Sequence, residues 1–193
     1  MLKWSFKQGD QNKKAIFSLL NGSEPNYNPK KWNDNIKIKK THNCYAYMLD
    51  YIDKSFKSKP QPGYNNGYTY LSDGDIRSCD KMFERIKADN PSFLKSSLYE
   101  PCPKGYRKGY LALDTSYDTD YHFYRLDANG RWSHKPGATE AQDKNSSGKP
   151  IYAPHLANRT SSSHNYNTSC GYFCFKKKKS KISNKIVSKK NNS

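Results

Sequence analysis

The chain has 193 residues, of which 34% are hydrophobic and 14% aromatic, and its formal net charge is +17. This length predicts one globular domain with one core and is too short for two ordinary domains. No stretch of about 18 consecutive apolar residues is present, which excludes a transmembrane helix of the usual kind.

The positive charge is concentrated at the C-terminus. The last 18 residues, "KKKKSKISNKIVSKKNNS", contain eight lysines and no acidic residue. Such a polar segment has too little apolar surface to offset the entropy lost on ordering. We therefore expect a single domain over residues 1–175 and a disordered lysine-rich tail over residues 176–193. The tail is a candidate for weak contact with nucleic acid or an anionic surface.

The cysteine count and the N-terminus favour a reducing compartment. The segment "MLKWSFKQGDQNKK" lacks the apolar region of a signal peptide, and the number of cysteines is odd. We therefore expect a cytoplasmic protein without a disulfide framework, located in the host cytoplasm or a virion if the source is viral. The spacing of Cys170 and Cys174 is unsuited to a zinc knuckle, so we expect no metal there.

The stretch "KKTHNCYAYMLDYIDKSF" predicts the first clear helix, because apolar residues recur at spacings of three and four. Asn43 is a good N-cap residue. Cys44 then lies in the first turn, where unpaired backbone N–H groups and the positive end of the helix dipole favour a thiolate. The apolar residues of this pattern are Tyr45, Met48, Leu49, Ile52 and Phe56.

A second helix is predicted over "SDGDIRSCDKMFERIKADNP", where Ser72 and Asp75 approximate a capping box and Pro91 ends the pattern. The hydrophobic period then changes to two in "YRKGYLALD", "YHFYRL", "RWSHK" and "GYFCF". Helices followed by antiparallel strands predict an α+β domain in which the Cys44 helix packs on the sheet.

The segment "DYHFYRLDANGRWSHKPG" predicts a hairpin. Asp127 and Gly130 are typical of the first and last positions of a tight turn, which pairs Tyr124 with His134. Strand alternation then places His122 and His134 on one face, diagonal to each other and within reach of one another. Tyr124 and Trp132 share that face.

A Cys at the start of a helix, followed by two His on neighbouring antiparallel strands, resembles the papain-like, NlpC-type cysteine endopeptidases and amidases. The resemblance implies a papain-like α+β fold with Cys44 as nucleophile, His122 as base and His134 as the group that orients the base. It implies a peptide or amide substrate, a thioester intermediate at Cys44 and no cofactor. Asn43 takes the place of the family's Asp and is a helix-cap and oxyanion-site candidate.

Three aromatic residues are candidates for the substrate cleft: Tyr45, Tyr124 and Trp132. Because Asn43 and Tyr45 depart from the family pattern, a catalytically degenerate peptide- or glycan-binding module of the same fold remains an alternative. A basic nucleic-acid-associated virion protein is another. The phrases "HFYRLDANGRWSHKPG" and "KPIYAPHLANR" also resemble uncharacterised proteins of bacteria and large DNA viruses.

Overall fold

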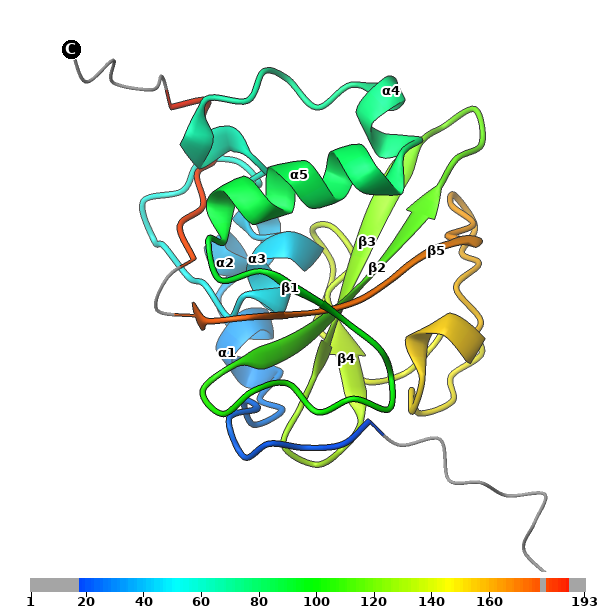
Figure 1. The fold of residues 1–193 in the computed structure, drawn as a ribbon. Helices are drawn as coiled ribbons and strands as arrows, with labels where there is room; N and C mark the ends of the chain where they lie inside the picture. The colour runs from blue at the N-terminus through cyan, green and yellow to red at the C-terminus, as the bar shows by residue number, and fades with distance from the viewer. Residues whose placement is uncertain (1–17, 178–179, 188–193) are drawn as a thin grey trace, which may run out of the picture.

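The computed structural model describes residues 18–177 and 180–187. A five-stranded antiparallel sheet with strand order β1-β5-β2-β3-β4 forms the centre, and helices α3 and α5 lie over one of its faces (Figure 1). The α+β class predicted from the sequence is confirmed. The helices are α1 (Lys30–Asn33), α2 (Ile36–Thr41), α3 (Cys44–Met48), α4 (Asp73–Ile76) and α5 (Cys79–Asp89), with short 3-10 turns η1 (Tyr64–Asn66) and η2 (Pro154–Leu156). The strands are β1 (Leu94–Ser96), β2 (Arg107–Asp114), β3 (Asp120–Leu126), β4 (Trp132–His134) and β5 (Thr168–Phe175).

Helix α3 begins where the sequence predicts but is much shorter than its apolar pattern. Asn43 caps its start by accepting a hydrogen bond from the Ala46 backbone. The helix ends in a Schellman motif, in which Asp50 N–H donates to Tyr47 and Tyr51 N–H donates to Ala46. Asp50 adopts a positive φ of 53°, so the chain turns away after Leu49.

The single helix predicted over residues 72–90 is two helices. Ser72 and Asp75 form the expected capping box at the start of α4. Ser78 then adopts an extended backbone and caps α5 through the Lys81 N–H. A second N-cap residue inside the apolar pattern therefore divides the helix.

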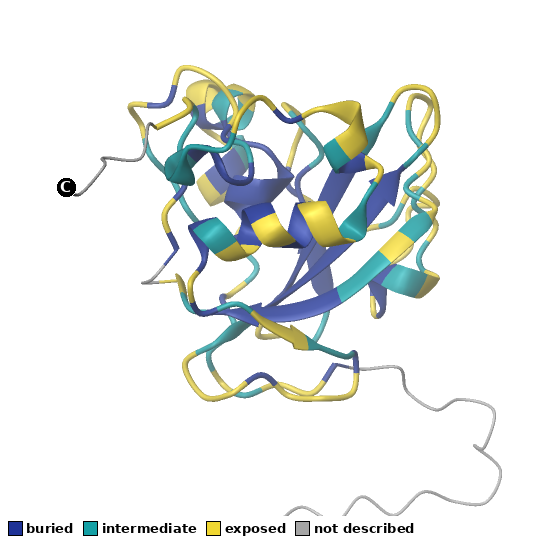
Figure 2. Ribbon diagram, turned by 45° about the horizontal axis from the view of Figure 1, so that its top comes forward, coloured by how far each residue is buried: buried dark blue, intermediate teal, exposed yellow. Residues whose placement is uncertain are grey.

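Both faces of the sheet are covered. Residues that alternate along β2, β3 and β5 pack either against α3 and α5 or against the long loop over residues 135–167. Figure 2 shows that β2 and β3 are buried along almost their whole length, whereas β1 at the edge is largely exposed. The loop contributes Ile151 and Ala153 to the second core.

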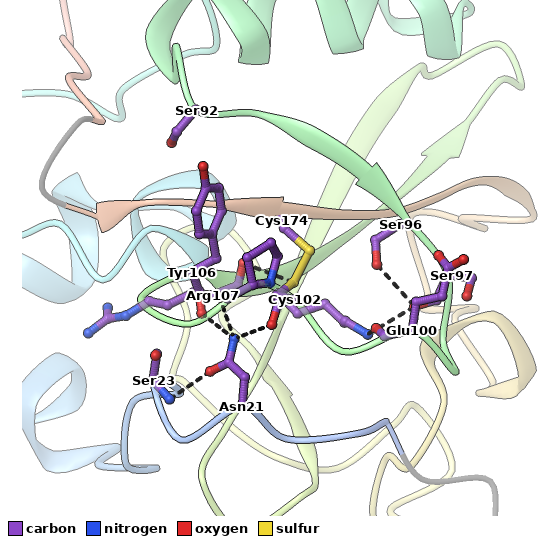
Figure 3. The surroundings of a disulfide bond; sticks show 12 residues. Asn21, Ser23, Ser92, Ser96, Ser97, Glu100, Cys102, Tyr106, Arg107 and Cys174 are labelled. Carbon is purple, nitrogen blue, oxygen red and sulfur yellow. Dashed lines mark hydrogen bonds between the residues drawn. A yellow bond between two sulfur atoms is a disulfide. The ribbon is translucent and has the colours of Figure 1, made fainter.

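Two disulfides fasten strand β5, so the expectation of free cysteines is wrong for four of the five. Cys79 at the start of α5 bonds Cys170, and Cys102 in the β1–β2 connection bonds Cys174 (Figure 3). The bridged residues are 91 and 72 positions apart. Cross-links that close such long loops restrict the unfolded chain strongly. The sequence pattern missed both pairs because their partners meet only in the folded sheet.

Polar contacts reinforce the Cys102 region. The Asn21 side chain donates to the Cys102 and Tyr106 carbonyls, at 2.9 Å each (Figure 3). Lys108 is 1% exposed, and its ammonium group donates to the carbonyls of Ser97 and Glu100. Buried N–H groups that find several acceptors fix the connection between β1 and β2.

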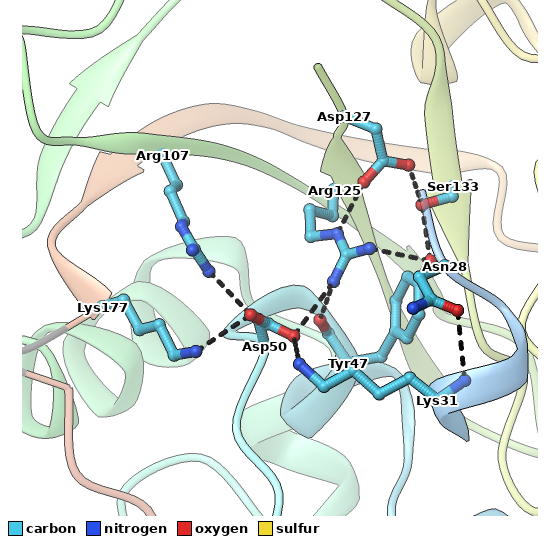
Figure 4. A network of polar contacts seen from close by, with 9 residues as sticks. All are labelled: Asn28, Lys31, Tyr47, Asp50, Arg107, Arg125, Asp127, Ser133 and Lys177. Carbon is cyan, nitrogen blue, oxygen red and sulfur yellow. Dashed lines mark hydrogen bonds and ion pairs between the residues drawn. The ribbon is translucent and has the colours of Figure 1, made fainter. Parts of the chain in front are cut away.

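A single carboxylate, that of Asp50, contacts four cationic side chains (Figure 4). They come from α1, β2, β3 and the residues after β5, and they are Lys31, Arg107, Arg125 and Lys177. Burial opposes ionisation of Asp50, but hydrogen bonds from Lys31 and Lys177 outweigh it and lower the pKa of the carboxyl group to about 2. The Asp50 network therefore joins segments from both ends of the chain.

The described part of the expected tail packs on the domain, so the predicted boundary at residue 175 is too early. Ile182 is 4% exposed and belongs to the core beneath α5. Backbone hydrogen bonds join Lys181 to Asp89 and Val187 to Tyr64. Residues 1–17, 178–179 and 188–193, which the domain and tail predictions also cover, lie outside the described residues.

Asp50→Asn should lower the free energy of unfolding by about 3 kcal/mol or more, because it leaves a cluster of partly buried cations without their counterion. Asn tolerates a positive φ, so the change isolates the charge from the turn. Asp53→Asn, which alters a carboxylate bonded to the nearby Ser55, is the control and should cost less than about 1 kcal/mol. Urea unfolding measures both, and equal losses would contradict the central role of Asp50.

Candidate functional site

The predicted hairpin and its register are confirmed. Asp127 N–H donates to the Arg131 carbonyl at 3.0 Å, Gly130 has a φ of 78°, and Tyr124 pairs with His134 across β3 and β4. This register brings His122 and His134 together on one face, with His122 Nε2 and His134 Nδ1 2.7 Å apart. The diagonal contact expected from strand alternation is therefore present.

The hydrogen bonds assign the tautomers of the two rings. His134 Nε2 lies 2.9 Å from the Lys144 carbonyl, which only accepts, so this nitrogen carries a hydrogen. Its Nδ1 then accepts from His122 Nε2–H when both rings are neutral. Burial lowers the pKa of His134 to about 4 and holds that of His122 well below 6.5. Both rings are thus neutral at physiological pH.

Aromatic rings surround the histidine pair. Tyr124 stacks on His134 with ring centroids 4.9 Å apart, and Tyr166 stacks on His122 at 5.0 Å. The Tyr166 hydroxyl donates to the Asp120 carboxylate at 2.6 Å. His164 lies beside the same carboxylate, with Nε2 3.7 Å from its oxygen. These contacts enclose the pair between the sheet, where β3 and β4 carry the two histidines, and the loop over residues 135–167.

The pair forms part of the wall of a cleft of about 650 Å³. Most of the other lining residues are polar or charged, and most come from the loop; the polar ones include Lys59, Asp120, Arg159, Ser161 and His164. Donors, acceptors and aromatic rings in one cleft suit a polar organic ligand better than an apolar one. Within the described residues, no group of three or more His, Cys, Asp or Glu side chains is placed to hold a metal ion.

Cys44 occupies the first position of α3, as predicted, but its surroundings disfavour a thiolate. The side chain is 4% exposed, and its Sγ lies 3.7 Å from the Tyr121 carbonyl at the edge of β3. Burial, and secondarily the Asp120 charge, raises the pKa of Cys44 to about 12. The expected lowering of the thiol pKa is therefore wrong, because desolvation outweighs the short helix.

The structure does not join the thiol to the histidines as an ion pair. Tyr121 and Phe123 face the core that contains Cys44, whereas His122 and Tyr124 face the opposite side of β3. For the described residues, the hydrogen bonds of Cys44 include none to His122 or His134. A neutral thiol and two neutral imidazoles lack the charge pair that activates a cysteine nucleophile.

Of the remaining predicted site residues, one lines the cleft and the others do not. Tyr124 lines the cleft, as predicted. Tyr45 and Trp132 do not, because both are fully buried. Tyr45 lies on α3 with its hydroxyl donating to Asp89, and Trp132 lies in the second core. Asn43 caps the helix, but its amide N–H₂ donates to Pro60 and the Tyr121 hydroxyl and is not directed to an oxyanion.

Sequence reasoning missed Asp120 and Tyr166 as cleft residues and did not select His164. Asp120 begins β3, and the other two lie in a Ser- and Asn-rich connection that has no periodic pattern. The length of that connection was the only signal, since long loops in compact domains often carry function. Nothing in the local sequence selects individual residues within it.

Acid should destabilise the domain through the histidine pair. Between pH 6.5 and 4 the unfolded chain binds protons at His134 that the folded chain excludes, so stability is complete above pH 6.5 and falls as the pH falls. The loss attributable to His134 should reach about 3 kcal/mol. His134→Asn should flatten the pH dependence, measured by urea unfolding from pH 7 to 4, whereas the more exposed His155→Asn should largely preserve it. Identical curves for wild type and His134→Asn would contradict the burial of a neutral pair.

The comparisons with known proteins give one informative relative. No protein-family model matches the chain, and no solved structure matches it. Insoluble matrix shell protein 1 from Ruditapes philippinarum is 34% identical over 135 residues, which cover 69% of this chain and 80% of that protein.

This relative overturns the predicted function. The relative's name describes a shell matrix protein and not a cysteine peptidase or amidase. The neutral thiol of Cys44 also argues against the predicted hydrolase. The expected cytoplasmic location is also wrong, because the two disulfides belong to an oxidising compartment and the relative is a shell matrix protein. Among the described helices, none is long and apolar enough to cross a membrane. By its identity and coverage, the chain belongs to the family of insoluble matrix shell protein 1.

Proposed function

We propose that this protein is a structural component of an extracellular insoluble matrix. The observation that carries the proposal is its 34% identity to insoluble matrix shell protein 1 over 80% of that protein's length. The two disulfides support it independently, because structural disulfides persist outside the reducing cytoplasm.

The positions of the disulfides suit a protein that must stay folded outside the cell, where cellular chaperones are absent. Strand β5 lies between β1 and β2, and Cys170 and Cys174 bond it covalently to α5 and to the β1–β2 connection. The Asp50 network adds ionic contacts from α1, β2 and β3. Cross-links that connect distant segments in this way restrict the unfolded chain and so stabilise the folded one, which suits a protein that must stay folded for a long time outside the cell.

Within this role, the histidine cleft is interpreted as a rigid part of the scaffold. His122, His134 and Tyr124 form a neutral, stacked and hydrogen-bonded group. For the finer fold we keep a papain-like arrangement as a proposal, supported by the helix that begins at Cys44 and packs against β3. This arrangement concerns architecture alone and carries no hydrolytic role.

Sequential extraction of the source material tests the proposed function. Buffered saline, detergent, demineralising acid and then chaotrope with reductant are applied in that order, and the protein in each fraction is quantified by mass spectrometry of its tryptic peptides. The protein should remain in the residue through the first steps and be released mainly by chaotrope with reductant. A cytosolic enzyme of the same tissue serves as the control for leakage. Recovery of this protein with that control in buffered saline would contradict the matrix role.

A further inference from the structure

The residues after β5 form an ordered surface element, which we call the C-terminal strap and define as residues 176–177 and 180–187. The Lys176 N–H donates to the Ser92 hydroxyl at 2.8 Å, and the Lys181 N–H donates to the Asp89 carbonyl at 3.0 Å. Farther along, Gln61 N–H reaches the Ser183 carbonyl. The strap thus runs from the end of β5 past the end of α5 (Figure 1, orange to red).

The strap contains both buried and exposed side chains. Ser180 and Ile182 are buried, with exposures of 5% and 4%, and Ile182 anchors the segment in the core. Lys177, Lys181 and Lys185 are exposed. The packing therefore holds exposed lysines on a segment that is itself anchored to the domain.

The positive charge near the start of the strap exceeds the negative charge beside it. In the network of Figure 4, four cationic side chains face only two carboxylates, those of Asp50 and Asp127. The side chains of Lys31 and Lys177 remain 38% and 42% exposed. The Asp89 carboxylate near Lys181 is already occupied by the Gly63 N–H, the Tyr45 hydroxyl and Asn66.

We propose that the C-terminal strap is a docking surface for an acidic polypeptide, one whose Asp or Glu carboxylates pair with Lys181, Lys185 and the exposed ammonium groups beside Asp50. Carboxylate is the anion that Lys31, Arg107 and Lys177 already bind within this chain. Because the strap backbone is held in place, binding loses less conformational entropy than it would on a disordered lysine tail.

The inference deepens the proposed function and rests on it for the origin of the partner, an acidic component of the same matrix. A protein that is insoluble in a matrix needs contacts to its other polymers, and complementary charge provides both specificity and rapid association. The binding itself is a property of the purified domain. The binding test therefore decides the docking proposal, and the extraction experiment decides the matrix role independently of it.

The test titrates fluorescently labelled poly-aspartate with the purified full chain and follows anisotropy at low and physiological salt. Lys181→Gln/Lys185→Gln should weaken binding about three- to tenfold and reduce its salt dependence, since exposed charge pairs are screened by ions. The double variant leaves the Lys177 contact to Asp50 intact, and thermal melting confirms that the fold is retained.

The matched control is Lys144→Gln/Lys149→Gln, which removes the same net charge from exposed positions in the loop over residues 135–167. It should change the affinity less than twofold. Equal losses in both double variants would mean that net charge alone drives binding and would overturn the proposal. Tighter, strap-dependent binding of a sulfated polysaccharide or of duplex DNA than of poly-aspartate would overturn the choice of an acidic polypeptide.

Discussion

The fold depends on one buried carboxylate. Asp50 ends α3 with a positive φ, and the same residue accepts the cationic groups of α1, β2, β3 and the C-terminal strap. A left-handed residue at this position is usually Gly, which carries no side chain. Asp instead couples the direction of the chain after α3 to the position of four other segments. The two disulfides then fix β5 within that arrangement.

Local features were predictable because their determinants lie close together in the sequence. The Asp127–Gly130 turn sets the register of the hairpin, so the contact between His122 and His134 follows from strand alternation alone. The caps at Asn43 and Ser72 follow from short-range side-chain hydrogen bonds. Long-range features were not predictable. Cys79 and Cys170 are 91 residues apart in the sequence. The burial of Ile182 depends on contacts with a distant core, and the lysine-rich sequence around it gives no sign of them.

The catalytic site implied by the resemblance and the structure differ in both geometry and environment. His122 faces the side of β3 opposite to Cys44, and Cys44, His122 and His134 are all buried. Sequence order gives the Cys, the two His and their elements correctly, but chemistry requires a thiolate and an imidazolium. Burial removes both charges, raising the pKa of Cys44 and lowering that of His122 and His134. A family resemblance based on residue spacing alone cannot predict whether the cysteine and histidine side chains are exposed to water or buried. The relative from Ruditapes philippinarum and the neutral groups both argue against a cysteine hydrolase.

The central claim is that this chain is an oxidised, extracellular structural protein, and the state of its cysteines in material from the source tests it most directly. The protein is alkylated in denaturant without reduction and mapped by mass spectrometry. Our account predicts linked peptides for Cys79–Cys170 and Cys102–Cys174 and alkylation at Cys44 alone. Alkylation of all five cysteines would place the native protein in a reducing compartment and contradict the account.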